Sequence, residues 1–177
     1  MKNAFTFGAL SALAGAVITL CFYLLGLHSD PAKIATAGWL QLALGLPVGI
    51  AIMLVGLRAK RSETPQERAF GYGRAFATGL GIGLVGLALG TVFEYVYESF
   101  INTNFVECTI QANLAKMEAN GLSQRQIDGS EAMMRKFSTP LVRALFSLVG
   151  GSVIVTLLAA VTAPFATRKG AELDEIP

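Results

Sequence analysis

Four stretches of the chain are almost free of charged residues, and each is long enough to cross a lipid bilayer. A transmembrane helix needs about 20 mostly apolar residues, because roughly 30 Å of hydrocarbon is crossed at about 1.5 Å per residue. The stretches cover Phe5–Leu27, Ile34–Leu57, Phe76–Phe93 and Ala144–Phe165. We therefore expect four spanning helices, at about residues 5–27, 34–57, 74–101 and 140–165.

The composition leaves little room for a separate soluble domain. Apolar residues make up 53% of the 177 residues, and the mean hydropathy is +0.56. Both values are too apolar for an ordinary soluble domain of this size, so we expect a single integral membrane domain over residues 1–177. The first stretch is longer than the apolar core of a secretory signal, which favours a retained anchor. The net charge is +2 and the basic residues are dispersed, which argues against nucleic acid as a partner.

Residues that bind metals or act as nucleophiles are sparse. A structural zinc site needs about four cysteine or histidine ligands, whereas the chain has Cys21, Cys108 and His28. No serine or cysteine stands beside an identifiable base. We therefore expect no catalytic residue, no metal and no cofactor. His28 is interpreted as an interfacial residue, and a disulfide between Cys21 and Cys108 is left open.

The placement of lysine and arginine predicts the orientation in the membrane, because short cytoplasmic connections carry an excess of both. The connection before the third span is rich in them: Arg58, Lys60, Arg61, Arg68 and Arg74. Lys2 precedes the first span, and Arg168 and Lys169 follow the fourth. The turn between the first two spans has Lys33 offset by Asp30. Both termini are therefore predicted to be cytoplasmic, and the polar segment after the third span is predicted to lie outside.

That polar segment is predicted to be an amphipathic helical hairpin over residues 104–137. Capping-box patterns open its two helices, Asn104 with Glu107 and Ser123 with Gln126, and Asn120-Gly121 forms a stop between them. Apolar residues recur at helical spacing, namely Val106, Ile110, Leu114 and Met117, then Ile127, Met134 and Phe137. Two interpretations remain: a cap packed over the bundle, or a surface that binds lipid or a partner.

One group of charged residues is predicted to lie at the outer ends of the third and fourth spans. Glu94 and Glu98 are four residues apart, so both face one side of a helix. Arg143 lies at a similar depth in the fourth span. An ionised group in hydrocarbon costs at least about 2.5–3.5 kcal/mol, so we expect Arg143 to pair with Glu94 or Glu98. The group is interpreted as an interhelical clasp, with a proton or ion relay as the alternative.

Other polar or small residues in the spans are interpreted as structural. Small residues allow helix backbones to approach closely in lipid, and we expect one such stripe at Gly79, Gly83, Gly86 and Gly90. Gln41 and Pro47 interrupt the second span, where proline is expected to kink the helix. Tyr95, Tyr97 and Phe100 are expected in an aromatic belt at the outer interface.

Several short motifs occur in a distinctive order. They are Tyr72-Gly73-Arg74-Ala75-Phe76-Ala77-Thr78-Gly79, Phe93-Glu94-Tyr95-Val96-Tyr97, Phe100-Ile101-Asn102 and Phe137-Ser138-Thr139-Pro140. Nearly the whole chain resembles the family named domain of unknown function 4199, small four-span bacterial membrane proteins. The resemblance implies a bacterial inner-membrane location, and it implies no activity, substrate or catalytic residue.

These features predict an all-α membrane protein: a four-helix bundle with an extracytoplasmic amphipathic helical segment between the third and fourth spans. The leading interpretation is a non-enzymatic, multi-pass protein with a structural or interaction role in the bacterial inner membrane. Membrane lipids are expected partners, and a homo-oligomer and an unknown membrane partner both remain open. The alternative is a small transporter or channel subunit with a polar site at Glu94, Glu98 and Arg143. An intramembrane enzyme ranks third.

Overall fold

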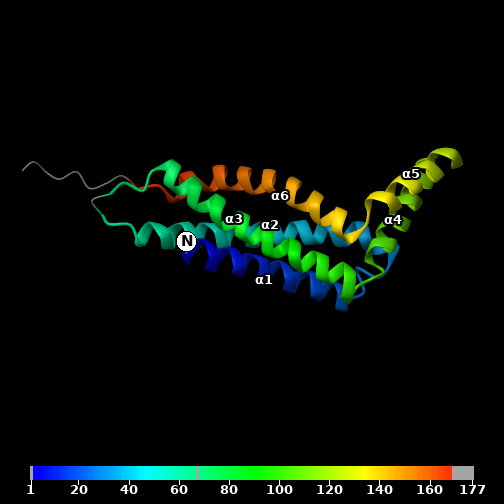
Figure 1. The fold of residues 1–177 in the computed structure, drawn as a ribbon, viewed down its shortest axis with the longest axis horizontal. Helices are drawn as coiled ribbons and strands as arrows, with labels where there is room; N and C mark the ends of the chain where they lie inside the picture. Colours follow the sequence, from blue (N-terminus) through cyan, green and yellow to red (C-terminus); the bar gives the residue numbers. More distant parts are fainter. Residues whose placement is uncertain (1, 67, 169–177) are drawn as a thin grey trace, which may run out of the picture. The chain divides into compact units, whose positions relative to one another are not determined.

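The computed structural model describes residues 2–66 and 68–168, and these residues form an all-α protein with six α-helices (Figure 1). The helices are α1 (Lys2–Leu24), α2 (Pro31–Ser62), α3 (Tyr72–Val96), α4 (Phe105–Ala119), α5 (Gln124–Phe137) and α6 (Pro140–Thr162). A π-helix, η1 (Tyr97–Ile101), continues α3, and a 3-10 helix, η2 (Ala163–Ala166), continues α6.

Four of these helices are long and apolar enough to cross a membrane, over Lys2–Leu24, Pro31–Ser62, Tyr72–Ile101 and Pro140–Ala166. Large apolar side chains on them remain exposed, including those of Val17, Val149 and Leu157. Lipid is a suitable environment for such surfaces, whereas contiguous apolar patches of this extent are rare on soluble proteins. The predicted fold class is confirmed: the protein is all-α, with four candidate spans and a helical segment between the third and fourth.

Two of the long helices begin at a proline, and the residue before that proline caps the first turn. The Asp30 carboxylate accepts a hydrogen bond from the backbone N–H of Ala32 at 3.0 Å, at the start of α2. The Thr139 hydroxyl accepts one from the backbone N–H of Val142 at 3.4 Å, at the start of α6. Thr64 differs, because its hydroxyl donates to the carbonyl of Lys60 at the end of α2. Glu67, three residues after Thr64 and in the position of a capping-box partner, lies outside the described residues.

The chain divides into two compact units, which are described separately below. Unit 1 comprises the described residues of Met1–Ala14, Leu46–Gly90 and Val149–Pro177, and unit 2 comprises Gly15–Gly45 and Thr91–Leu148. Each long helix contributes residues to both units. The single integral domain expected from the sequence stays a prediction.

Unit 1 has an apolar core in which Phe70 is fully buried together with Leu57, Ala163 and Ala166. Phe70 belongs to the connection between α2 and α3, and it forms two backbone hydrogen bonds of 2.9 Å with Arg168. The Arg168 guanidinium also donates to two carbonyl groups of that connection, at 3.0 and 2.9 Å. The residues after α6 are thereby attached to the connection between α2 and α3.

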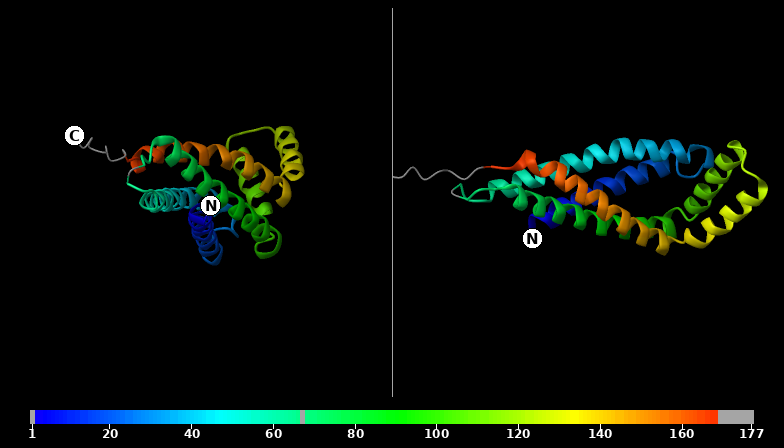
Figure 2. Two further views of the ribbon diagram at one scale, coloured as in Figure 1. Left: turned by 60° about the vertical axis from the view of Figure 1, so that its left-hand side comes forward. Right: turned by 90° about the horizontal axis from the view of Figure 1, so that it is seen from above.

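Unit 2 includes the helical hairpin formed by α4 and α5, which lie side by side (Figure 2). Ile110 and Leu114 of α4 are buried with Ile127 of α5, and the partly buried residues around them are Val106, Met117 and Met134. The apolar positions predicted from helical spacing therefore converge on one another. Phe137 departs from this pattern, since 48% of it is exposed. Gly121, between the two helices, has a φ of 74°, which favours glycine.

Candidate functional site

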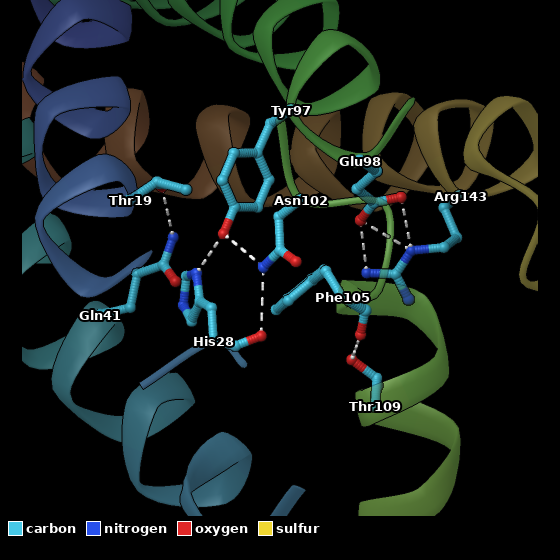
Figure 3. Close-up of polar contacts among 9 residues, drawn as sticks. All are labelled: Thr19, His28, Gln41, Tyr97, Glu98, Asn102, Phe105, Thr109 and Arg143. Atoms are coloured by element: carbon cyan, nitrogen blue, oxygen red, sulfur yellow. Dashed lines mark hydrogen bonds and ion pairs between the residues drawn. The ribbon is translucent and has the colours of Figure 1, made fainter. Parts of the chain in front are cut away.

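Within unit 2, Arg143 and Glu98 form a closed ion pair (Figure 3). The Arg143 Nε donates to both carboxylate oxygens of Glu98 at 2.9 and 3.0 Å, and Nη2 lies 2.8 Å from Oε1. The Glu98 side chain is 1% exposed and the Arg143 side chain is 26% exposed. Charge-assisted contacts of this kind are the strong class of protein hydrogen bonds. They compensate for removing the carboxylate from water.

Local structure on both sides of the ion pair brings the two residues together. Glu98 lies in η1, where a wider π-helical turn replaces the last α-helical turn of α3. Turns of this kind are rare overall, but they occur frequently at functional sites. Arg143 lies in the first turn of α6, where its backbone N–H bonds to the Thr139 carbonyl. The Arg143 guanidinium also lies over the Phe105 ring, at 5.7 Å from the ring centroid. This cation–π contact fixes the guanidinium further.

Glu94, the third residue of the predicted group, is not part of the ion pair. It is half-buried one turn before Glu98, and within residues 2–66 and 68–168 it makes no salt bridge. One further turn back, the Thr91 hydroxyl is buried and has no hydrogen-bond partner among the described residues. Glu94 and Glu98 were both predicted to face the same side of the helix, and Arg143 pairs with Glu98.

A second polar cluster, which we call the His28 cluster, consists of His28, Tyr97 and Asn102 (Figure 3). The Asn102 amide nitrogen donates to the Tyr97 hydroxyl at 3.0 Å and to the His28 carbonyl at 3.1 Å. The Tyr97 hydroxyl lies 2.9 Å from Nδ1 of His28. The three residues are between 2% and 4% exposed. The cluster therefore links the segment between α1 and α2 to η1 and to Asn102, which directly follows η1.

The surroundings of His28 favour one tautomer of its ring. Because Tyr97 already accepts from Asn102, its own proton is available for Nδ1 of His28, which leaves the ring proton on Nε2. Gln41 donates to the Thr19 hydroxyl at 3.1 Å, and its carbonyl oxygen lies on the His28 side (Figure 3). Burial lowers the pKa of His28 from the usual 6.5, and the weaker effect of a hydrogen bond with Gln41 opposes it.

Aromatic rings complete the enclosure of His28. The Phe22 ring lies edge-on at 5.8 Å between centroids, and the Phe105 ring lies at 4.9 Å. Phe105 is the first residue of α4, so its ring contacts His28 and also lies beneath the Arg143 guanidinium. The base of the hairpin is thus in contact with both polar groups of unit 2.

His28 and Tyr97, interpreted as interfacial residues, are each 2% exposed, so their side chains contact other parts of the protein and face neither lipid nor water. Tyr95 and Phe100 are 40% and 74% exposed, as an aromatic belt requires. Helical periodicity shows that Tyr95 and Tyr97 face different sides, but it does not show which side is covered. The pairing of His28 with Tyr97 has no local signal, because 69 residues separate them.

An exposed ion-pair network joins the two helices of the hairpin. Arg135 of α5 donates to both carboxylate oxygens of Glu107 at 2.8 and 3.0 Å, and to Glu131 at 2.8 Å. Hydrogen bonds from Arg135, then from Gln111, lower the pKa of Glu107 to about 2. The predicted capping box of Asn104 with Glu107 is not formed, because the Asn104 side chain makes no cap and Glu107 binds Arg135 instead. The capping box of Ser123 with Gln126 is formed.

The four glycines predicted as one packing stripe face different neighbours in unit 1. Gly79 lies against Ala159, and a Cβ on Gly83 would collide with Val155, so both glycines face α6. Gly86 faces Gly8 and Ser11 of α1, while Gly90 has no atom within 4 Å of its Cβ position.

Both cysteines, Cys21 and Cys108, are free thiols.

Both polar groups lie in the part of the chain that matches a known family. Residues 6–168 match the family described as "Protein of unknown function (DUF4199)". The chain belongs to the DUF4199 family. No curated protein and no solved structure matches it. The resemblance noted from the sequence motifs is therefore confirmed, and the four candidate spans indicate a multi-pass membrane protein.

The two polar groups of this DUF4199 protein differ in their chemistry. Glu98 and Arg143 neutralise each other, and their hydrogen bonds are directed at one another. Burial favours the neutral form of His28, and histidine is the side chain whose charge ordinarily changes between about pH 5 and 8. The ion pair is therefore suited to holding helices together, whereas the His28 cluster can respond to protons.

Proposed function

We propose that this DUF4199 chain is a non-enzymatic protein of the bacterial inner membrane with a structural or interaction role. In this proposal both termini are cytoplasmic, and the α4–α5 hairpin is held outside the membrane, where it meets lipids or a partner. The polar residues of unit 2 serve to fix the base of that hairpin. The four candidate spans and the family membership are the framework on which the proposal rests.

The observation that carries the proposal is the closed Glu98–Arg143 ion pair. A transport site has to bind and release its substrate, so its polar groups must be accessible from water at some stage. The Glu98 carboxylate is 1% exposed and is bonded by Nε and Nη2 of Arg143. A pair of this kind suits an interhelical clasp better than a transport site.

The distribution of charge supports the proposed orientation. Lysine and arginine recur from the last turns of α2 through the α2–α3 connection to the start of α3, and again just after α6, and unit 1 contains both segments. The hairpin carries basic and acidic residues in balance, and its Arg135 is bonded to Glu107 and Glu131. An excess of basic residues in short connections is typical of the cytoplasmic side.

Flux measurements test the structural role against the transporter alternative. The purified protein is reconstituted into liposomes that contain a pH-sensitive dye, and proton and sodium gradients are applied in turn. We expect the same leak rate as in protein-free liposomes. A flux that Glu98→Gln or Glu94→Gln abolishes would contradict the structural role and establish the transporter.

Cysteine labelling tests the orientation. In a background with both native cysteines replaced by serine, Gln124→Cys places a thiol on the hairpin and Ser62→Cys places one at the end of α2. Both positions are exposed, so they form a matched pair. An impermeant maleimide added to intact cells should label Gln124→Cys, and Ser62→Cys only after permeabilisation. The reverse pattern would overturn the proposed orientation.

A further inference from the structure

The His28 cluster contains a base whose burial favours its neutral form, against the weaker opposing effect of Gln41. His28 belongs to the short connection between α1 and α2, whereas Tyr97 is the first residue of η1 and Asn102 directly follows η1, ahead of α4. The bonds between His28 and these two residues join the connection to the base of the hairpin. A change in the charge of the His28 ring would therefore act directly on the hydrogen bonds that join these two segments.

Protonation of His28 would remove the role of the Tyr97 hydroxyl as a donor. With both ring nitrogens protonated, Nδ1–H would point at an oxygen that already accepts from Asn102. The Tyr97 proton would then lose its acceptor in a buried site, and an unpaired buried donor is costly. The cation itself would also lie in a site lined by Phe22 and Phe105.

The charged and titratable groups around His28 offer no compensation. On the far side of the Phe105 ring lies the Arg143 cation, while Glu98 is bonded to Arg143. Asp30, two residues after His28, is bonded to Lys33 and to the Ala32 backbone. The other titratable groups near the ring are the phenols of Tyr97 and, beside it, Tyr23. Within residues 2–66 and 68–168, no carboxylate forms an ion pair with His28.

We propose that the His28 cluster is a proton-operated latch, in which protonation of His28 releases the base of the α4–α5 hairpin from the α1–α2 connection. The latch is closed at neutral pH and opens on acidification. This inference goes beyond the role proposed above and is independent of the orientation of the protein in the membrane.

The linkage between protonation and opening has a definite sign. Burial lowers the pKa of His28 in the closed state, so the open state binds the proton more tightly. The stability of the closed state is therefore complete above about pH 6.5 and decreases as the pH falls below that value. The Glu107–Arg135 pair does not contribute in this window, because the pKa of Glu107 is about 2.

Two measurements on the full chain in lipid nanodiscs test the latch. His28 is the chain's single histidine, so an untagged, ¹⁵N-histidine-labelled sample gives one imidazole titration by NMR. Hydrogen exchange followed by mass spectrometry reports protection of residues 97–106 between about pH 7.5 and about pH 5, corrected for intrinsic rates. We expect the imidazole to titrate with a midpoint below about pH 6.5. Below about pH 6.5, protection from exchange should fall about tenfold per pH unit, until the ring is protonated in the closed state as well.

Matched variants assign the effect. His28→Gln cannot gain a proton and should abolish the pH dependence of exchange. Asp30→Asn, at a neighbouring residue whose side chain is 41% exposed, should retain it. The proposal is overturned if the imidazole titrates without any change in exchange, or if the change persists in His28→Gln. Should His28→Gln fail to fold, the two profiles of the unmodified protein still decide: a loss of protection that does not follow the imidazole titration overturns the latch.

Discussion

Each of the two units is stabilised by a different kind of internal contact. In unit 1, small residues lie against aliphatic side chains, with Gly8 beside Val85 and Gly151 beside Leu87. In unit 2, the Glu98–Arg143 pair and the His28 cluster connect segments that are far apart in sequence. Both units draw on the same four long helices, so the difference lies in the side chains that each unit brings into contact.

The difference shows what each kind of contact can specify. In lipid there is little hydrophobic drive between helices, so close approach at small residues supplies association energy. Such contacts depend on volume. Polar groups inside a span are costly unless they are paired, and their hydrogen bonds allow few geometries. We therefore expect substitutions in unit 1 to act through size, and substitutions in unit 2 to act through charge and hydrogen bonding.

The largest effect should come from Arg143→Leu, which leaves the buried Glu98 carboxylate without its partner. Breaking a buried ion pair on one side costs about 3–5 kcal/mol, whereas replacing both partners by apolar residues is often neutral. The free energy of unfolding in mixed micelles should therefore fall by that amount. The double variant of Glu98→Leu with Arg143→Leu should recover most of the loss. A double variant as unstable as the single one would contradict the proposed role of charge in unit 2.

A smaller effect is expected in unit 1 from Gly83→Ala, because the new Cβ would collide with Val155 of α6. Overpacking of this kind costs about 1–3 kcal/mol. Gly90→Ala is the matched control, since its Cβ would meet no atom within 4 Å. The same unfolding measurement should show Gly83→Ala to be less stable than Gly90→Ala. Equal stability of the two variants would show that volume does not limit the packing of unit 1.

Tyr97→Phe should have a moderate effect, because it removes one hydroxyl and little volume. The Asn102 amide and Nδ1 of His28 each lose a partner, and a lost hydrogen bond of this kind costs about 1 kcal/mol. Tyr95→Phe is the control, since Tyr95 is 40% exposed and lies on another side of the helix. Thermal unfolding should separate the two variants, and identical midpoints would remove the His28 cluster from the contacts that stabilise unit 2.

The smallest effect is expected from Arg135→Gln in the hairpin, because exposed ion pairs contribute little. Its signature is pH dependence. The pKa of Glu107 is held at about 2, below its usual 4.5, so the stability from this carboxylate is present above about pH 4.5 and is lost as the pH falls toward 2. Hydrogen exchange in α4 should rise over that interval, and less so in Arg135→Gln. An equal rise in both proteins would contradict the contribution of this pair.

The prediction of the ion pair shows how far sequence reasoning reaches. The cost of a charge in hydrocarbon predicts that Arg143 pairs with a glutamate at the same depth. It does not distinguish Glu94 from Glu98, since residues four apart share one side of an α-helix. The choice depends on the π-turn Tyr97–Ile101 and on where α6 begins beside it.

The hairpin gives a similar result. The spacing of Ile110, Leu114 and Ile127 predicted two amphipathic helices, and the structure shows that their apolar faces cover one another. The pattern predicted the capping box of Ser123 correctly but failed for Asn104, because Glu107 has a stronger partner in Arg135. Local rules hold where no distant charge competes for the side chain.

The sequence by itself determined that the chain has four candidate spans and a helical segment between the last two, because apolar length and helical periodicity are local properties. Tertiary structure alone decided which polar residues meet. His28 and Tyr97 are 69 residues apart, and the His28 carbonyl and Asn102 are 74 apart. Nothing in the local pattern of either segment encodes the other. Their hydrogen bonds exist because folding brings the α1–α2 connection against the π-turn, in a site that excludes water.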